Sequence, residues 1–148
     1  MIALASDHGG FLLKQAISNY LKEQNIAFFD YGTYDEASVD YPVMVSQPCS
    51  DIQTQKVDKG IFVCGTGIGI SIAANKHNGI RAACVSESYS AKLAREHNDA
   101  NVLCLGGRVI SSEYALSIVE IFLSTEFSGV PRHKDRIAQI TKIEESQK

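Results

Sequence analysis

Short apolar runs alternate along the chain with longer stretches in which apolar residues recur every three or four positions. Strands are predicted by the apolar runs at residues 2–5, 27–32, 60–64, 80–85 and 101–106. Helices are predicted by the spacing of apolar residues over 11–23, about 42–56, the stretch after the glycines to about 76, about 87–97 and about 112–123. A last, polar helix is expected over 131–148. This alternation is typical of a parallel sheet covered by helices on both faces.

We therefore expect a single α/β domain over residues 1–148, a three-layer, Rossmann-like sandwich around five parallel strands. Ligands bind such sheets beyond the carboxyl ends of the strands, near the point where the strand order reverses. Asp7 and His8 follow the first predicted strand, Cys64 ends the third and Arg108 follows the fifth. Pro48 lies inside the second predicted helix, where it predicts a kink or a late helix start.

Composition narrows the class of protein. The 148 residues carry a net charge of −3, so the chain has no excess of positive charge with which to bind nucleic acid. No apolar run approaches the ~18 residues of a membrane span. The N-terminal MIALASDHGG has no positive segment and predicts a first strand, not a signal peptide. The sequence thus indicates a cytoplasmic globular protein with neither a nucleic acid nor a membrane as partner.

The four cysteines have no zinc-like pair spacing. Three of them, Cys64, Cys84 and Cys104, lie in strand-like runs, where a buried free thiol is the common case. Without an export signal, reduced cysteines in the cytoplasm are the simplest account.

The segment 64-CGTGIG-69 places a thiol at a strand–helix corner with three glycines at alternate positions. Glycines let the backbone turn sharply with its N–H groups outward, and the following helix start favours an anion. The positive potential of these N–H groups and of the helix start favours the thiolate form of Cys64. A dinucleotide fingerprint would need glycine where Ile70 stands, and a triphosphate-binding loop would need Gly-Lys-Ser/Thr. An anion cradle beside a reactive sulfur and a plain tight turn both remain open.

Two polar pairs have structural as well as functional interpretations. Asp7-His8 stands between a buried strand and Gly9-Gly10, where an N-cap aspartate with a surface histidine is the common case. His97-Asn98 ends the fourth predicted helix, where a histidine followed by a left-handed asparagine cap is equally ordinary.

Arg132 and Arg136 are four residues apart and so share one face of the last helix. Two guanidinium groups on one face suit a phosphate. A solvated basic face is the alternative, although cations are unusual near a helix start.

Together these segments resemble type B ribose-5-phosphate isomerases, in the family that also holds the galactose-6-phosphate and allose-6-phosphate isomerases. The resemblance covers nearly the whole chain and rests on segments in family order. They are SDHGG, GTYDEASVDYP, CGTGIGISIAANK, GIRAA, REHNDANVL, GGRV and RH-x-x-R. Before Arg132 the chain has SGVP, where relatives often have a glycine pair, so this loop is expected to differ in length and stiffness.

The resemblance implies the interconversion of D-ribose 5-phosphate and D-ribulose 5-phosphate in the pentose phosphate pathway. Cys64 is similar to the base that moves a proton between C2 and C1, and Thr66 to the residue that assists proton movement among the oxygens. Some relatives carry a glutamate base at the position of Ile70, so the cysteine branch is indicated. His97 is similar to the acid that opens the furanose ring, with Asp7 nearby.

The resemblance also implies the binding residues. The amides from Gly65 through Gly67 and Ile68 to Gly69 resemble the anion hole for the enediolate, and Asn98 resembles a sugar contact. Contacts to the phosphate end are implied for His8, Arg108, Arg132 and Arg136. This chemistry needs no metal or organic cofactor, and the sequence offers no ligand set for one.

Relatives are dimers or dimers of dimers that share each site between subunits, so the last helix is expected to pack on a partner subunit. Allose 6-phosphate and galactose 6-phosphate are the nearest alternative substrates. A non-catalytic module that binds a phosphorylated ligand is the alternative from another class, and a cysteine hydrolase is a third.

Overall fold

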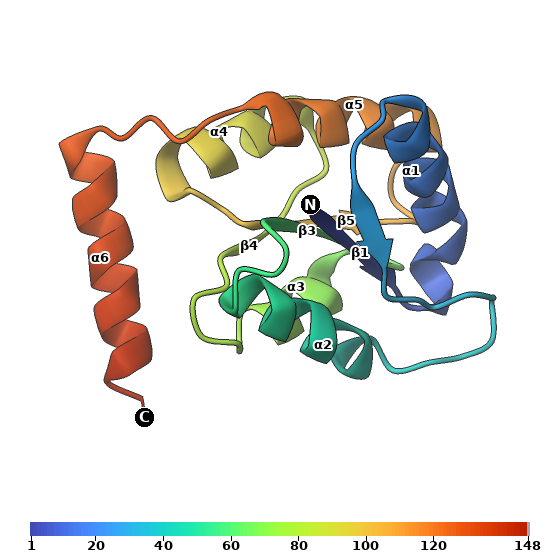
Figure 1. The fold of residues 1–148 in the computed structure, drawn as a ribbon, viewed down its shortest axis with the longest axis horizontal. Helices are drawn as coiled ribbons and strands as arrows, with labels where there is room; N and C mark the ends of the chain where they lie inside the picture. Colours follow the sequence, from blue (N-terminus) through green and yellow to red (C-terminus); the bar gives the residue numbers. More distant parts are fainter. Residues whose placement is uncertain (148) are drawn as a thin grey trace.

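The computed structural model describes residues 1–147. Its five strands form one sheet, in the order β2-β1-β3-β5-β4, and every neighbouring pair is parallel (Figure 1). The strands are β1 (Ile2–Ser6), β2 (Phe28–Asp30), β3 (Lys59–Cys64), β4 (Ala82–Cys84) and β5 (Val102–Gly106). The predicted parallel sheet is confirmed, with β2 and β4 shorter than predicted because each is an edge strand with one neighbour.

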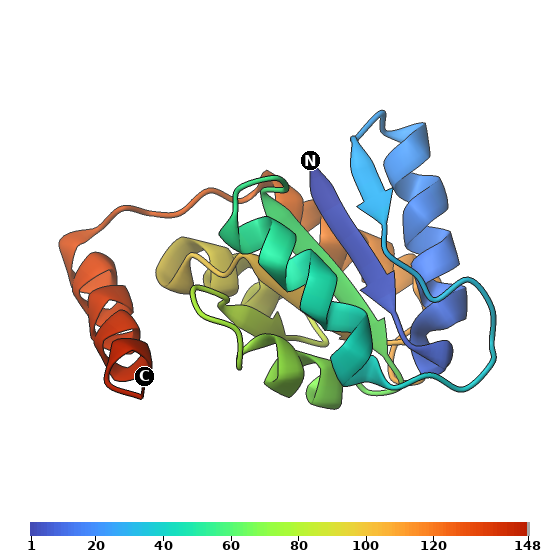
Figure 2. The same cartoon turned by 60° about the horizontal axis from the view of Figure 1, so that its bottom comes forward.

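Two helical layers cover the sheet, as the sequence predicts (Figures 1 and 2). The helices are α1 (Phe11–Glu23), α2 (Tyr41–Gln53), α3 (Ile68–Ala74), α4 (Ser88–Asn98), α5 (Ser112–Ser124) and α6 (Pro131–Glu145). One face packs on α1, α4 and α5 through residues such as Leu4, Ile17 and Phe122. The other packs on α2 and α3 through residues such as Phe62, Val45 and Ile70. Cys64 belongs to this second core.

Pro48 does not delay α2. The helix begins at Tyr41, with Pro42 in its first turn, and continues through Pro48 to Gln53. Pro42 needs no hydrogen-bond donor in the first turn, and Pro48 removes only the bond to the carbonyl of Met44. The predicted late start is therefore wrong.

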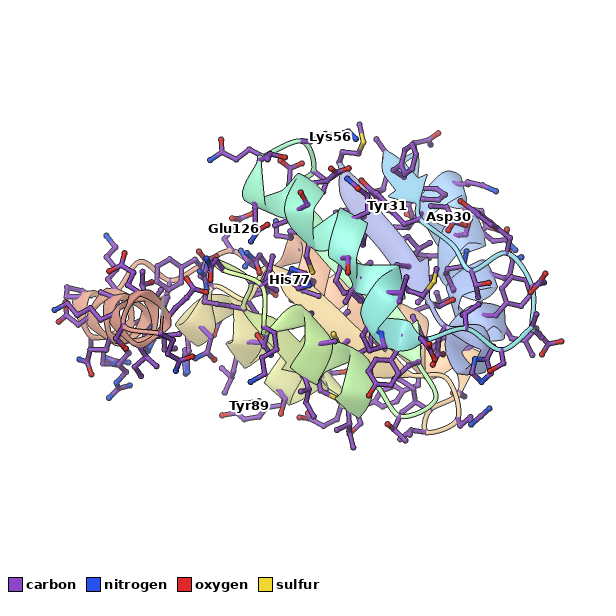
Figure 3. All side chains as sticks on the ribbon, turned by 90° about the horizontal axis from the view of Figure 1, so that it is seen from below. Asp30, Tyr31, Lys56, His77, Tyr89 and Glu126 are labelled. Carbon is purple, nitrogen blue, oxygen red and sulfur yellow. The ribbon has the colours of Figure 1, made fainter. Side chains whose placement is uncertain are left out.

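Helix α6 stands apart from the sheet and its two layers, and its side chains radiate away from the helix on all sides (Figures 1 and 3). Near its end, Glu144 accepts a hydrogen bond from the Gly79 N–H at 2.8 Å. Ile140 and Ile143, which are 47% and 60% exposed, line a cavity of about 650 Å³ between α6 and the loop that precedes β4. None of the helices in residues 1–147 is long and apolar enough to cross a membrane.

Candidate active site

Cys64 ends β3 beside β1, where the strand order reverses, and its side chain is only 4% exposed. Its sulfur accepts a hydrogen bond from the Gly67 N–H at 3.1 Å. Gly67 has φ +79°, a left-handed conformation that glycine adopts readily, and α3 begins at the next residue. The glycine turn therefore folds its backbone around the sulfur and aims an amide at it.

Loops after β1 and β5 close on this turn. A methyl group on Gly9 would lie 3.1 Å from the Gly65 nitrogen, so the two loops touch. The Arg108 N–H donates to the Gly65 carbonyl at 3.0 Å, and a methyl group on Gly65 would lie 3.3 Å from Arg108 Nη1. Asp7 is buried, and its carboxylate accepts from the Gly10 N–H at 3.1 Å. The capping interpretation of Asp7 thus holds, and the residue lies at the site as well.

His8 is oriented by a backbone group that sequence reasoning missed. The Val39 N–H donates to His8 Nδ1 at 3.3 Å. An amide donor at Nδ1 means that this nitrogen is unprotonated, so a neutral ring carries its proton on Nε2. The loop before α2 therefore leaves His8 with one donor, Nε2, for a ligand.

Thr66 and Tyr41 complete this part of the site. The Ile68 N–H donates to Thr66 Oγ1 at 3.3 Å, which leaves the hydroxyl proton of this exposed residue for another acceptor. The Tyr41 ring lies over Gly69, where an added methyl group would come within 2.7 Å of Cζ. The sequence showed Tyr41 only as a helix start, so its contact with the glycine turn was missed. We call this set the cysteine cluster: Asp7, His8, Cys64, Gly65, Thr66, Gly67, Ile68, Gly69 and Arg108.

A second group of predicted site residues gathers around the end of α4. His97 stacks on His133 of α6, with ring centroids 4.3 Å apart. His133 is buried, and its Nδ1 lies 2.7 Å from Ser128 Oγ. Burial, followed by the positive charges of His97, Arg132 and Arg136, lowers the pKa of His133. We call His97, Asn98, Arg132 and Arg136, with His133 between them, the histidine cluster.

The structure does not bring the two clusters together within one chain. Helix α4 starts beyond the carboxyl end of β4 and returns across the sheet, so His97 and Asn98 lie just before the amino end of β5. Cys64 is paired in register with Gly106 at the carboxyl end of the same strand. Five strand residues span roughly 13 Å, which separates the two edges. This separation of the two clusters could have been predicted from the sequence, because a helix that connects parallel strands must return to the amino edge of the sheet.

The other cysteines lie in different surroundings, and all four are free. Burial raises the pKa of Cys49 to about 12 and that of Cys104 well above its usual range. Cys84 is exposed, contrary to the expectation of a buried thiol, because β4 is an edge strand. Within residues 1–147, no three His, Cys, Asp or Glu side chains gather as a metal site.

Comparison with known proteins agrees with the sequence resemblance. The profile of the family described as Ribose/Galactose Isomerase matches residues 2–140. The chain belongs to the ribose/galactose isomerase family. A relative in this family, ribose-5-phosphate isomerase B of Escherichia coli, is 47% identical over 97% of this chain and 96% of its own length.

Solved structures of the family share the whole fold. Ribose-5-phosphate isomerase B of Clostridium thermocellum is 46% identical, covers 99% of both chains and superposes with a TM-score of 0.97. The enzyme of Mycoplasma genitalium, solved with bound ribulose-5-phosphate, is 40% identical, covers 97% of this chain and 95% of its own, and gives a TM-score of 0.91.

Proposed function

We propose that this protein is a ribose-5-phosphate isomerase that interconverts D-ribose 5-phosphate and D-ribulose 5-phosphate through an enediolate. The observation that carries the proposal is the Cys64 sulfur, held at 3.1 Å by the Gly67 amide where the strand order reverses. Family membership supports the reaction, and the relative with bound ribulose-5-phosphate supports a sugar phosphate as substrate. Four free thiols are in keeping with a cytoplasmic enzyme.

We assign the proton transfer to Cys64. Its thiolate would take the proton from C2 and return it to C1, or the reverse, and the Gly67 N–H would stabilise the sulfur anion. Thr66 Oγ1 already accepts a hydrogen bond from the Ile68 N–H. Its hydroxyl would donate a hydrogen bond to the substrate oxygens and so assist the movement of protons between them.

Negative charge that builds on the substrate oxygen needs donors that are already in place. The amides of Gly67 and Ile68 have partners within the chain, so we assign the oxygen to those of Gly65, Thr66 and Gly69. One such donor contributes about 3 kcal/mol to transition-state stability.

The contacts to the phosphate would come from both subunits, and the ring-opening acid from the subunit that does not supply Cys64. His8 Nε2 and Arg108 belong to the cysteine cluster, whereas Arg132 and Arg136 lie at the opposite edge of the sheet. We propose a homodimer, or a dimer of dimers, in which the histidine cluster of one subunit faces the cysteine cluster of its partner. His97 would then open the furanose ring, with Asp7 nearby, and Asn98 would contact the sugar. The exposed Ile140 and Ile143 of α6 support its packing on the partner.

The test of this function is turnover of ribose 5-phosphate by the parent protein and by Cys64→Ala. A general base predicts a loss of about 100-fold or more in kcat. Activity near that of the parent would contradict the cysteine mechanism. A parallel assay with allose 6-phosphate separates the pentose from the hexose substrate, and a protein that binds both sugars without converting either would be a binding module.

A further inference from the structure

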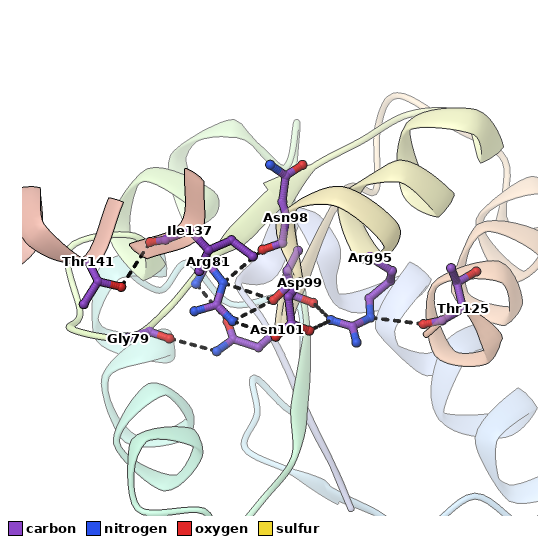
Figure 4. Close-up of polar contacts among 10 residues, drawn as sticks. Gly79, Arg81, Arg95, Asn98, Asp99, Asn101, Thr125, Ile137 and Thr141 are labelled. Atoms are coloured by element: carbon purple, nitrogen blue, oxygen red, sulfur yellow. Dashed lines mark hydrogen bonds and ion pairs between the residues drawn. The ribbon is translucent and has the colours of Figure 1, made fainter. Parts of the chain in front are cut away.

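Two arginines from different elements hold the end of α4, and both bind Asp99 (Figure 4). Arg81, just before β4, donates from Nε to the carbonyls of Asn98 and Asp99 at 3.0 and 3.1 Å. Its Nη2 donates to the carbonyl and to carboxylate Oδ2 of Asp99 at 2.8 and 3.2 Å. From the other side, Arg95 Nη1 donates to Asp99 Oδ1 at 2.8 Å and to the Ala100 carbonyl at 2.6 Å. We call Arg81, Arg95 and Asp99 the Asp99 clamp.

The clamp holds a backbone conformation that the sequence did not predict. Asp99, and not Asn98, takes the left-handed cap position, with φ 45° and ψ 45°. Aspartate adopts this conformation more readily than most residues, and the bonds from Arg81 and Arg95 hold it there. Asn98 is the last helical residue, and its side chain points away from the clamp (Figure 4). The direction in which the chain leaves the helix, directly after His97 and Asn98, therefore depends on Asp99.

The same helix end anchors the segment that leads to α6. Arg95, only 4% exposed, donates from Nε to the Thr125 carbonyl at 3.2 Å. The Ser128 N–H donates to the Glu96 carbonyl at 3.1 Å. Residues 125–130 lead directly into the helix that carries Arg132 and Arg136.

We propose that the Asp99 clamp is a positioning device for the opening of the sugar ring. It fixes His97 and Asn98 at the end of α4. Through the bond from Arg95 to Thr125, it also connects them to the segment before Arg132 and Arg136. This inference rests on the proposed function, because it takes His97 as the ring-opening acid. Arg81 and Asp99 touch no substrate themselves and act through the residues that they hold.

Hydrogen exchange in the open-chain sugar distinguishes a ring-opening defect from a general loss of activity. Ribose 5-phosphate closes to a furanose, which must be opened before isomerisation. Ribulose 5-phosphate is an open chain, because the C5 oxygen that would close its five-membered ring is esterified. In heavy water, Cys64 can take a C1 hydrogen from ribulose 5-phosphate and return deuterium, and this exchange needs neither ring opening nor ring closure. A misplaced His97 should therefore slow the net conversion of the sugars more than this exchange.

The variants are Arg81→Gln and Asp99→Asn, with Arg81→Lys as the milder change. Lys92→Gln is the matched control, because it removes an exposed ion pair with Glu96 on the same helix, 3.5 Å long, away from the clamp. We expect kcat/KM for conversion to fall about tenfold or more in both directions, because the equilibrium constant fixes the ratio of the two values, and deuterium exchange into ribulose 5-phosphate to slow about threefold or less. His97→Asn should show the same selective loss of conversion, and the control should match the parent.

Equal losses of conversion and of exchange, or no loss, would overturn the positioning role even if the variants are less stable. Failure of the parent to convert either sugar would instead count against the proposed function. The clamp is then decided by crystal structures of Arg81→Lys and Asp99→Asn. A displaced His97 ring would support it, and a ring in its original place would overturn it.

Discussion

At the scale of single residues, Cys64 differs from the other thiols in what its sulfur contacts. The Gly67 N–H points at it, whereas burial raises the pKa of Cys49 and Cys104. A raised pKa disfavours the thiolate, which is the form that acts as a base. Cys64, whose sulfur accepts a hydrogen bond from the backbone, is therefore the thiol to which we assign the proton transfer.

The variant Gly67→Ala tests how strictly the glycine turn is required. Gly67 has φ +79°, and an added methyl group would lie 2.9 Å from the Leu105 carbonyl carbon and 3.1 Å from Cys84 Sγ. We expect the unfolding free energy to fall by about 2 kcal/mol from backbone strain and contact together. Activity should fall further than the folded fraction, because the amide that donates to Cys64 must move.

Gly79→Ala is the matched control for this change. Gly79 has φ +73° but no atom within 4 Å of the added methyl group. Its unfolding free energy should fall by about 1 kcal/mol, the cost of a left-handed backbone for alanine, and its activity should equal that of the parent. Denaturation curves and initial rates measure both variants, and an equal loss of activity in the two would contradict the role of the Gly67 amide.

His133 predicts a pH dependence of stability. Its pKa is lowered in the folded protein, first by burial and then by His97, Arg132 and Arg136. The unfolded chain therefore binds the additional proton more readily as the pH falls below about 6.5, and the parent loses stability on acidification. In His133→Asn, which does not titrate, we expect a smaller decrease in unfolding free energy from pH 7 to pH 5. Denaturation curves that shift in parallel for the two proteins would contradict this.

At the scale of elements, much of the architecture could be predicted from the pattern of apolar residues. Helix α1 has the predicted bounds, and β1, β3 and β5 lie where buried runs predict them. The gathering of the cysteine cluster could also be predicted from the sequence, because the carboxyl ends of parallel strands lie at one edge of a sheet. The hydrogen bond from Val39 to His8 and the two arginines on Asp99 could not be predicted, because each joins residues whose contact depends on the packed fold.

The prediction for helix α6 concerns the binding of the substrate phosphate. Arg132 and Arg136 are exposed, on one face of the first two turns. Replacing either with Ala should raise the KM for ribose 5-phosphate with a smaller change in kcat, because a phosphate contact contributes to ground-state and transition-state binding alike. Lys142→Ala, an exposed cation in the last turn, is the control. Steady-state kinetics with KM unchanged in both arginine variants would place the phosphate elsewhere.

At the scale of the whole molecule, the proposed catalytic residues are divided between two edges of one sheet. Cys64 lies at the carboxyl edge and His97 near the amino edge, and α6 stands apart with exposed isoleucines. In the proposed dimer, a single chain would therefore hold two halves of different sites. Two copies related by a twofold axis would form two complete sites, since each edge would face its complement.

Complementation between two impaired variants tests this account most directly. Cys64→Ala and His97→Asn are each assayed with ribose 5-phosphate, then mixed under conditions that exchange subunits, and assayed again. In a mixed dimer one site carries both changes and the other carries neither. With random exchange, the mixture should regain about a quarter of the parental activity. A mixture no more active than its components, despite proven exchange, would contradict a site built by Cys64 of one subunit and His97 of its partner.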